Sequence, residues 1–338
     1  MRKTTKKQAT QQQSRMTSYL FLLINTITWG LALVIVKPSL EFTTPFRYLL
    51  YRYCIAAILS VPILLYYWPK VKNKLTAIKK VALVEFFGTG VALGLLYLGL
   101  AKTSAIEASF LTTTTPIFVV LAGIIFLQEK QEKNEWLGLL VAFAGTTLLA
   151  FFPVILNGMT PAGLSLEGNL LILFGNIATA IGMILAKKHY KNIPKFFATS
   201  IGFYFGIVVF LFLSIAELLF TAPASQVTGL DSTVIQHFIQ VVIRDLSQTS
   251  VLFAAVYMAL FGSIIGLTAY IKGQDGIEAS EASLFWYLQP LVFVPAGVLF
   301  LQEEVHFLQI ISMILIFIGV YIAEQRTTQE KITRQKLG

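Results

Sequence analysis

Charged side chains inside long apolar runs are the first candidates for chemistry in this sequence. Arg52, Glu107 and Glu281 lie within such runs, and Lys37 ends another. An ionisable group is costly to keep in apolar surroundings, so an ion-binding or proton-relay role is the first hypothesis for each. A serine three residues before Glu107 completes a capping-box pattern. This pattern favours a helix-cap role for Glu107, and for Glu281 in its matching position.

Arg52 and Lys37 each allow two interpretations. Arg52 lies about six residues inside its apolar run. It can therefore extend its side chain towards the outer surface, or pair with an acid such as Glu107 or Glu217. Lys37 directly precedes Pro38. It is either a cation at a helix end or a residue that lines a cavity.

Aromatic and amide side chains within the apolar runs are the second group of candidates. A pocket for a small zwitterion or an aromatic metabolite needs aromatic faces and a few amides. The same side chains also commonly pack or form hydrogen bonds between helices. With Lys37 added, the predicted substrate-binding residues are Trp29, Asn176, Trp286, Asn25, Lys37, Tyr287 and Gln289.

Metal, redox and hydrolytic chemistry have little support. The chain has one cysteine, Cys54, and its three histidines are far apart in sequence, so we predict no metal site and no cofactor. No HExxH pattern and no GxxxxGK[ST] pattern occurs. An enzyme that acts on lipids or peptides within the membrane is therefore a weak alternative, and we predict neither catalytic residues nor an ATP site.

Composition places these residues in a membrane protein. Of 338 residues, 56% are hydrophobic and only 13% are charged, with a mean hydropathy of +0.73. A soluble chain of this length carries roughly a quarter charged residues. The net charge of +9 raises the question of nucleic acid, but the bases form short clusters between apolar runs. They are therefore interpreted as topology signals and contacts to anionic lipid.

Ten segments are apolar and long enough to cross a bilayer, which predicts an all-α integral membrane protein with ten transmembrane helices. The segments are 18–37, 46–68, 81–101, 104–127, 136–156, 168–187, 196–220, 251–273, 280–301 and 305–324. With the N-terminus inside, 21 Lys and Arg residues fall on inner segments and four on outer ones. Both termini are therefore expected in the cytoplasm. Between 221 and 250 we expect an external amphipathic helix at the membrane surface.

An internal repeat divides the chain. Residues 105–129 and 279–303 align without a gap, and 12 of 25 positions are identical. The same alignment pairs Gly145 with Gly319, and a GxxxG pair at Gly90 and Gly94 recurs at Gly262 and Gly266. We predict two five-helix repeats, 18–156 and 168–324, after a disordered cytoplasmic leader (1–17) and before a cytoplasmic tail (325–338). Five is odd, so the repeats have inverted topology, as in many secondary transporters.

The sequence resembles the EamA group of the drug/metabolite transporter superfamily over nearly all of its length beyond the leader. The segments that carry the resemblance are Trp29-Gly30 with Lys37, the run from Arg52 to Ala57, the run from Tyr97 to Ala105, and Pro116 and Gln289-Pro290, each followed by Phe-Leu-Gln-Glu. The resemblance implies ten helices, cytoplasmic termini, a central cavity and, most often, export of amino acids and related metabolites. One departure is Ile181-Gly182 in the place of Trp29-Gly30, which implies an asymmetric cavity.

Together these features predict a secondary transporter in the cell membrane that exports amino acids or related small metabolites by alternating access. An uptake permease or exchanger, or a flippase for a lipid-linked substrate, is the alternative on the same fold. The expected partners are a small-molecule substrate and the lipid bilayer, not nucleic acid. A homodimer is also compatible with the sequence.

Overall fold

The chain folds into helices, and no strand occurs among the residues that the structure describes. The structure is a computed structural model that describes residues 2–127, 133–151, 165–221, 232–273, 285 and 288–324. Among these residues, seven stretches are long and apolar enough to cross a membrane: Met16–Glu41, Pro45–Lys70, Lys74–Lys102, Ala105–Phe126, Leu166–His189, Lys195–Phe220 and Thr249–Gly273. The prediction of a helical membrane protein is therefore confirmed.

Three shorter apolar helices coincide with the three remaining predicted spans. They are Trp136–Ala150, Pro290–Leu301 and Phe307–Gly319. Within the described residues, none of these three apolar stretches reaches the roughly 20 residues of a full crossing. The total of ten crossings therefore stays a prediction.

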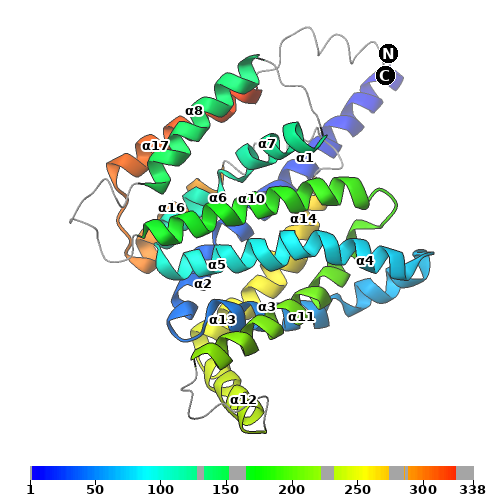
Figure 1. The fold of residues 1–338 in the computed structure, drawn as a ribbon. Helices are drawn as coiled ribbons and strands as arrows, with labels where there is room; N and C mark the ends of the chain where they lie inside the picture. The colour runs from blue at the N-terminus through cyan, green and yellow to red at the C-terminus, as the bar shows by residue number, and fades with distance from the viewer. Residues whose placement is uncertain are drawn as a thin grey trace.

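The elements of the first half follow one another with short connections (Figure 1). They are α1 (Arg2–Gly30), α2 (Ala32–Val36), η1 (Lys37–Glu41), α3 (Pro45–Tyr67), η2 (Trp68–Lys70), α4 (Lys74–Glu85), η3 (Phe86–Val91), α5 (Ala92–Lys102), α6 (Ala105–Thr112), α7 (Thr115–Leu127) and α8 (Lys133–Ala150). α1 begins at Arg2, within the segment 1–17 that the sequence analysis treats as a leader. Lys, Gln and Arg are good helix formers, and extending an existing helix avoids a new nucleation step.

The second half repeats the pattern of long helices. Its elements are α10 (Leu166–His189), α11 (Lys195–Thr221), α12 (Ser232–Leu246), α13 (Thr249–Tyr257), η4 (Met258–Gly266), α14 (Leu267–Gly273), α16 (Pro290–Leu301) and α17 (Phe307–Glu324). Local sequence fixes several helix starts. Ser104 and Ser165 precede α6 and α10, and each side chain accepts a hydrogen bond from the backbone N–H three residues later.

Helices of the two halves pack against each other rather than only within their own half. In the described part of the chain, α1 lies against η4 and α14, while α10 lies against α5. The pair α3 and α11 and the pair α8 and α17 also join the halves, and Figure 1 shows α8 beside α17 at the edge of the bundle. Each half therefore buries much of its apolar surface against the other.

The α8–α17 contact is made by two glycines that the sequence repeat pairs. A Cβ added to Gly319 would lie 2.3 Å from the Ala142 nitrogen and 2.5 Å from the Gly138 oxygen. A Cβ added to Gly145 would lie 2.8 Å from the Ser312 oxygen and 3.0 Å from Ile316 Cγ1. The shift in numbering that pairs the glycines also pairs Gly138 with Ser312 and Ala142 with Ile316. The two helices therefore make equivalent contacts with each other, as expected for a pair related by a two-fold axis.

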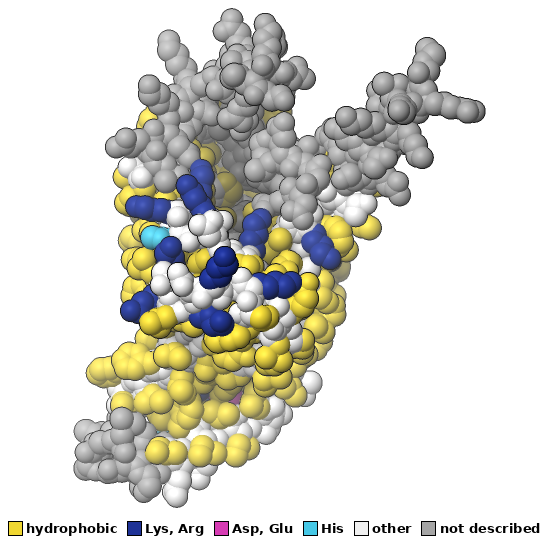
Figure 2. Space-filling view, turned by 90° about the vertical axis from the view of Figure 1, so that its right-hand side faces the viewer, with side chains coloured by type: hydrophobic (Ala, Val, Ile, Leu, Met, Phe, Trp, Pro, Cys, Tyr) yellow, Lys and Arg dark blue, Asp and Glu magenta, His cyan; other side chains and the backbone are white. Residues whose placement is uncertain are grey.

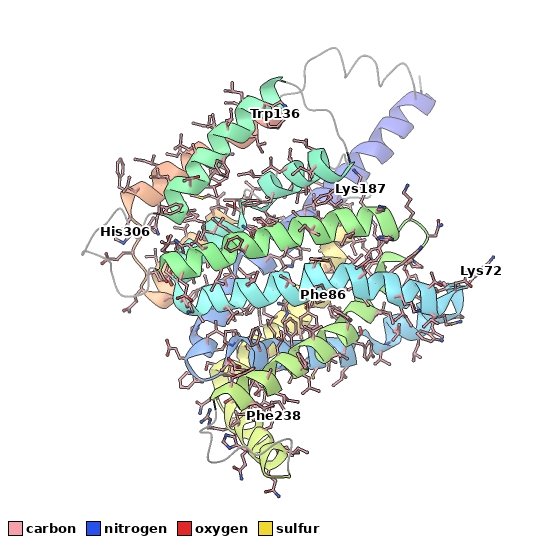
Figure 3. The ribbon with its side chains drawn as sticks, viewed as in Figure 1. Lys72, Phe86, Trp136, Lys187, Phe238 and His306 are labelled. Carbon is pink, nitrogen blue, oxygen red and sulfur yellow. The ribbon has the colours of Figure 1, made fainter. Side chains whose placement is uncertain are left out.

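The two ends of the bundle differ in charge. Figure 2 shows Lys and Arg side chains gathered across one end face. Lys72 and Lys187 mark this end in Figure 3, and His306 lies at the other. Exposed lysines at the basic end include Lys70, Lys72, Lys79, Lys80, Lys187, Lys188, Lys191 and Lys195. These are the lysines that the positive-inside pattern assigns to the cytoplasm.

The opposite end carries the expected amphipathic helix, α12, which is tied to the bundle by a buried ion pair. Phe238, Val242 and Leu246 pack against the core, while Ile235, Ile239 and Ile243 form an exposed apolar stripe. Next to them, the fully buried Asp245 accepts a hydrogen bond from Arg47 Nε at 2.8 Å. Its carboxylate also accepts from Thr43 at 2.6 Å and from Tyr51 at 3.1 Å.

The glycine crossing generates a stability prediction. Gly319→Val places a branched side chain against the backbone of α8, so we expect a loss of about 1–3 kcal/mol from overpacking. The measurement is thermal unfolding of the purified protein in detergent. Ile314→Ala is the matched control on α17, because its side chain is half exposed. A Gly319→Val midpoint equal to that of wild type would contradict the close approach.

Candidate functional site

Two π-helical segments lie at matching positions of the two halves. η3 begins at Phe86 and η4 begins at Met258, and the shift that pairs Gly90 with Gly262 also pairs these two residues. Figure 3 places Phe86 between the two ends of the bundle. A π-helical turn interrupts the regular hydrogen-bond ladder of an α-helix and is common at functional sites. These segments therefore mark the middle of the bundle as the candidate site.

Arg52 lies beside η4, and its neighbours are neutral. We call Arg52, Tyr48, Tyr53, Tyr97 and Ser263 together the Arg52 cluster. Arg52 Nη1 donates to the Tyr97 hydroxyl at 3.0 Å, and Nη2 donates to Ser263 Oγ at 3.3 Å. The guanidinium also lies 5.6 Å from the centre of the Tyr53 ring. Tyr48 stacks on Tyr97 with ring centres 5.5 Å apart. An arginine held only by hydroxyl groups and rings is available to an anion.

The predicted ion pair between Arg52 and Glu107 or Glu217 does not form. Glu217 accepts a hydrogen bond from Thr44 at 2.5 Å, and Glu107 accepts from Asn169 of α10 at 2.6 Å. Within the described residues, no carboxylate lies at ion-pair distance from Arg52. The alternative of an extended side chain that reaches the surface also fails, because the guanidinium lies between α5 and η4 inside the bundle.

Asn25 and Trp29 of α1 contact the same π-helical segment. Trp29 Nε1 donates to the Gly262 carbonyl at 3.0 Å, and Asn25 Nδ2 donates to the Gly266 carbonyl at 3.0 Å. Asn25 is fully buried, and its Oδ1 has no hydrogen-bond donor among the described residues. The structure therefore brings two predicted site residues together beside η4, where both hold the halves in contact.

Asn176 lies elsewhere, on α10. Its Nδ2 donates to the Leu111 carbonyl at 2.8 Å and to Thr114 Oγ1 at 3.1 Å, at the end of α6. This is the run of threonines before Pro116, in which the hydroxyls of Thr112 to Thr115 each donate to the backbone carbonyl three residues earlier. Asn176 thus joins α10 to the break between α6 and α7, and no described contact links it to Asn25 or Trp29.

Lys37 and Gln289 have mainly backbone roles in this structure. Lys37 Nζ donates to the carbonyls of Leu100 at 2.7 Å and Thr103 at 2.6 Å, so it caps the C-terminal end of α5. The carbonyl of Gln289 accepts from two backbone N–H groups in the first turn of α16. The helix-end interpretation of Lys37 is therefore the one that the contacts support. Trp286, Tyr287 and Glu281 lie outside the described residues.

Glu107 is fully buried, but its carboxylate does not act as the predicted cap. Its backbone N–H donates to Ser104 Oγ at 3.0 Å, which is one half of the capping box. Glu303, from the other half of the chain, supplies the carboxylate at this helix end. Its two oxygens accept from the N–H groups of Ala105 and Ile106, each at 2.7 Å. A carboxylate at a helix N-terminus is favoured by the helix dipole.

Glu85, at the end of α4, is a partly buried acid that the sequence interpretation missed. Its carboxylate accepts hydrogen bonds from Thr89 and, at 3.3 Å, from Tyr190 at the basic end of the bundle. Thr89 in turn lies 3.4 Å from the Tyr53 hydroxyl. A row of hydroxyl and carboxyl groups thus leads from the Arg52 cluster towards the lysine-rich face. Its sequence signal was an acid inside the predicted span 81–101.

Comparison with known proteins agrees with this architecture. The model of the EamA-like transporter family matches residues 16–151 and 166–324. An uncharacterized transporter of Archaeoglobus fulgidus is 25% identical over 313 residues, which cover 92% of this chain and 100% of that protein. The uncharacterized transporter YcxC of Bacillus subtilis is 24% identical over 306 residues, covering 90% of this chain and 91% of YcxC.

A eukaryotic relative is matched over a shorter stretch. Solute carrier family 35 member F6 of Rattus norvegicus is 27% identical over 246 residues, which cover 70% of this chain and 63% of the rat protein. The family model covers most of the chain and meets the helices described above. This chain is therefore a multi-pass membrane protein that belongs to the EamA-like transporter family.

Proposed function

We propose that this protein is a secondary transporter that exports amino acids or related small metabolites by alternating access. The observation that carries the proposal is the pair of π-helical segments at matching positions, η3 and η4. Each lies where helices of opposite halves meet: α10 packs against η3, and α1 packs against η4. An interrupted helix at the middle of a repeat is where inverted-repeat transporters bind substrate.

The two-fold contacts support a ten-helix inverted repeat. The pairs α1–η4 and α10–η3 exchange partners between the halves, and Gly145 and Gly319 make equivalent contacts across α8 and α17. Two similar halves that rock about a shared middle give inward-open and outward-open states of nearly equal energy. The exposed lysines at one end support cytoplasmic termini in a cell membrane.

The contact of Glu303 with α6 fits an outer gate. It links the two halves at the end opposite the lysine-rich face, next to the Lys37 cap on α5. It consists of two charge-assisted hydrogen bonds to backbone groups that no helical carbonyl can satisfy. In the outward-open state these bonds separate, and water replaces the carboxylate.

Transport without ATP is the direct test of the proposed function. The purified chain is reconstituted into vesicles after metabolite profiling of cells with and without it has identified the compounds whose distribution changes. We expect those compounds to cross the vesicle membrane down their gradients without ATP, because the sequence has no P-loop. Unchanged metabolite profiles, or a strict need for ATP, would overturn the proposal.

The side chains that join the halves near the π-helical segments and the α6–α7 break should be required for transport. Trp29→Ala and Asn176→Ala each remove hydrogen bonds between the halves, of about 0.5–1.5 kcal/mol apiece, so both variants should remain folded while transport is largely lost. Transport and thermal stability are measured on the same samples. Phe143→Ala and Ile314→Ala, on the exposed faces of α8 and α17, are the controls. Normal transport by either site variant would assign that residue to packing alone.

The outer gate has its own test. Glu303→Gln keeps the size of the side chain and loses its charge, so we expect the α6 N-terminus to be held less tightly, by about 0.3–1 kcal/mol. On a Cys54→Ser background, Thr103→Cys is buried in the closed state and should react faster with an impermeant maleimide added from outside. Glu304→Gln, one residue along the chain and exposed, should leave the rate unchanged. Equal labelling rates for both variants would reject the gate.

A further inference from the structure

We propose that Arg52 binds the transported molecule directly, as the site of a single carboxylate group on a small organic substrate. This inference rests on the proposed function, since it concerns the molecule that the transporter carries. It assigns a role to the one cation that the structure leaves beside the middle of the bundle without an anionic partner in the described part of the chain.

The comparison with other basic residues near α3 shows how unusual this state is. Arg47, five residues earlier on the same helix, bonds to Asp245 at 2.8 Å and is almost fully buried. Lys37 places its ammonium group on the carbonyls at the end of α5. Arg52 has only the neutral oxygens of Tyr97 and Ser263. A buried charge without a counter-charge is destabilising, so its retention points to an anion that arrives from outside the chain.

The unused donors of Arg52 have the geometry of a carboxylate site. Its Nε is buried and has no acceptor among the described residues, and the neighbouring Nη2 makes only the long bond of 3.3 Å to Ser263. Nε and Nη2 form one edge of the guanidinium, and two parallel N–H groups on such an edge match the two oxygens of a carboxylate. Arg52 as a whole is partly accessible rather than fully buried. A substrate carboxylate would therefore take the open edge and replace the bond to Ser263.

The surroundings fix the charge of the substrate and the nature of its remaining part. One guanidinium balances one negative charge, so a carboxylate fits and a phosphate monoester with two charges would leave one uncompensated. The guanidinium contacts Tyr97 and the ring of Tyr53, and Tyr48 stacks on Tyr97. These rings are themselves buried, and their aromatic character favours an apolar group next to the bound carboxylate. Because Ser263 lies within η4, binding at Arg52 also acts on the segment that joins α14 to α13.

A defined efflux experiment tests the inference. Proteoliposomes are loaded with an equimolar mixture of the common amino acids, short-chain monocarboxylates, the carboxamide counterparts of both sets, and glycerol 3-phosphate. Efflux is followed by mass spectrometry for wild type, Arg52→Gln, Arg52→Lys and the exposed control Arg244→Gln. Thermal unfolding of each sample shows whether the variant is folded.

The inference is supported if wild-type proteoliposomes release one or more monocarboxylates but not the corresponding carboxamides. Arg52→Gln should reduce that efflux by about tenfold or more, Arg52→Lys less, and Arg244→Gln not at all. Equal efflux of carboxamides or of glycerol phosphate would overturn it, as would wild-type efflux by Arg52→Gln. If Arg52→Gln does not fold, Arg52→Lys together with the carboxamide comparison decides. Absence of any efflux overturns the carboxylate site, and cellular metabolite profiling then decides separately whether the protein is a transporter.

Discussion

The structure depends on hydrogen bonds in which a polar group of one half of the chain is satisfied by a side chain of the other half. In lipid, a backbone carbonyl freed by a helix irregularity finds no water, so a side chain has to reach it. In η4 the carbonyls of Gly262 and Gly266 accept hydrogen bonds from Trp29 and Asn25, which belong to α1 of the other half. Neither half is therefore complete by itself, and the middle of the bundle is where the mutual dependence is greatest.

The same dependence makes the middle a place where the chain can change shape. A regular α-helix satisfies its own backbone and moves as a rod. A π-helical segment has already given up part of that regularity, so a change in its neighbours alters fewer internal bonds. At the end opposite the lysine-rich face, Glu303 and Lys37 bind helix termini instead, through charge on backbone groups. Water can replace either partner in hydrogen bonds of this kind, whereas it cannot replace the apolar contacts of a packed glycine crossing.

Much of the fold could be predicted from the sequence because hydropathy and charge act over whole segments. The apolar runs, the basic end and the amphipathic helix α12 all follow from patterns that lipid imposes. The π-helical segments were not predicted. Phe86 to Val91 and Met258 to Gly266 each contain at least one glycine of the GxxxG pairs, but glycine weakens a helix without specifying a π-helical turn. The acid at the start of α6 was predicted to be Glu107, and the structure places Glu303 there for a similar reason. Sequence shows which acid is near a helix start in the chain, but not which acid from the other half reaches it in space.

The glycine crossing between α8 and α17 has a consequence for how such a chain evolves. Gly319 contacts Gly138 and Ala142 of α8, and Gly145 contacts the equivalent positions of α17, Ser312 and Ile316. A substitution in one copy of the duplicated segment therefore meets the unchanged copy across the contact, and neither side can drift alone. Near the middle of the bundle the two halves differ in sequence, since the second half has Ile181-Gly182 where the first has Trp29-Gly30. The crossing is thus under joint selection, whereas residues near the middle of the bundle can diverge while the two halves keep fitting.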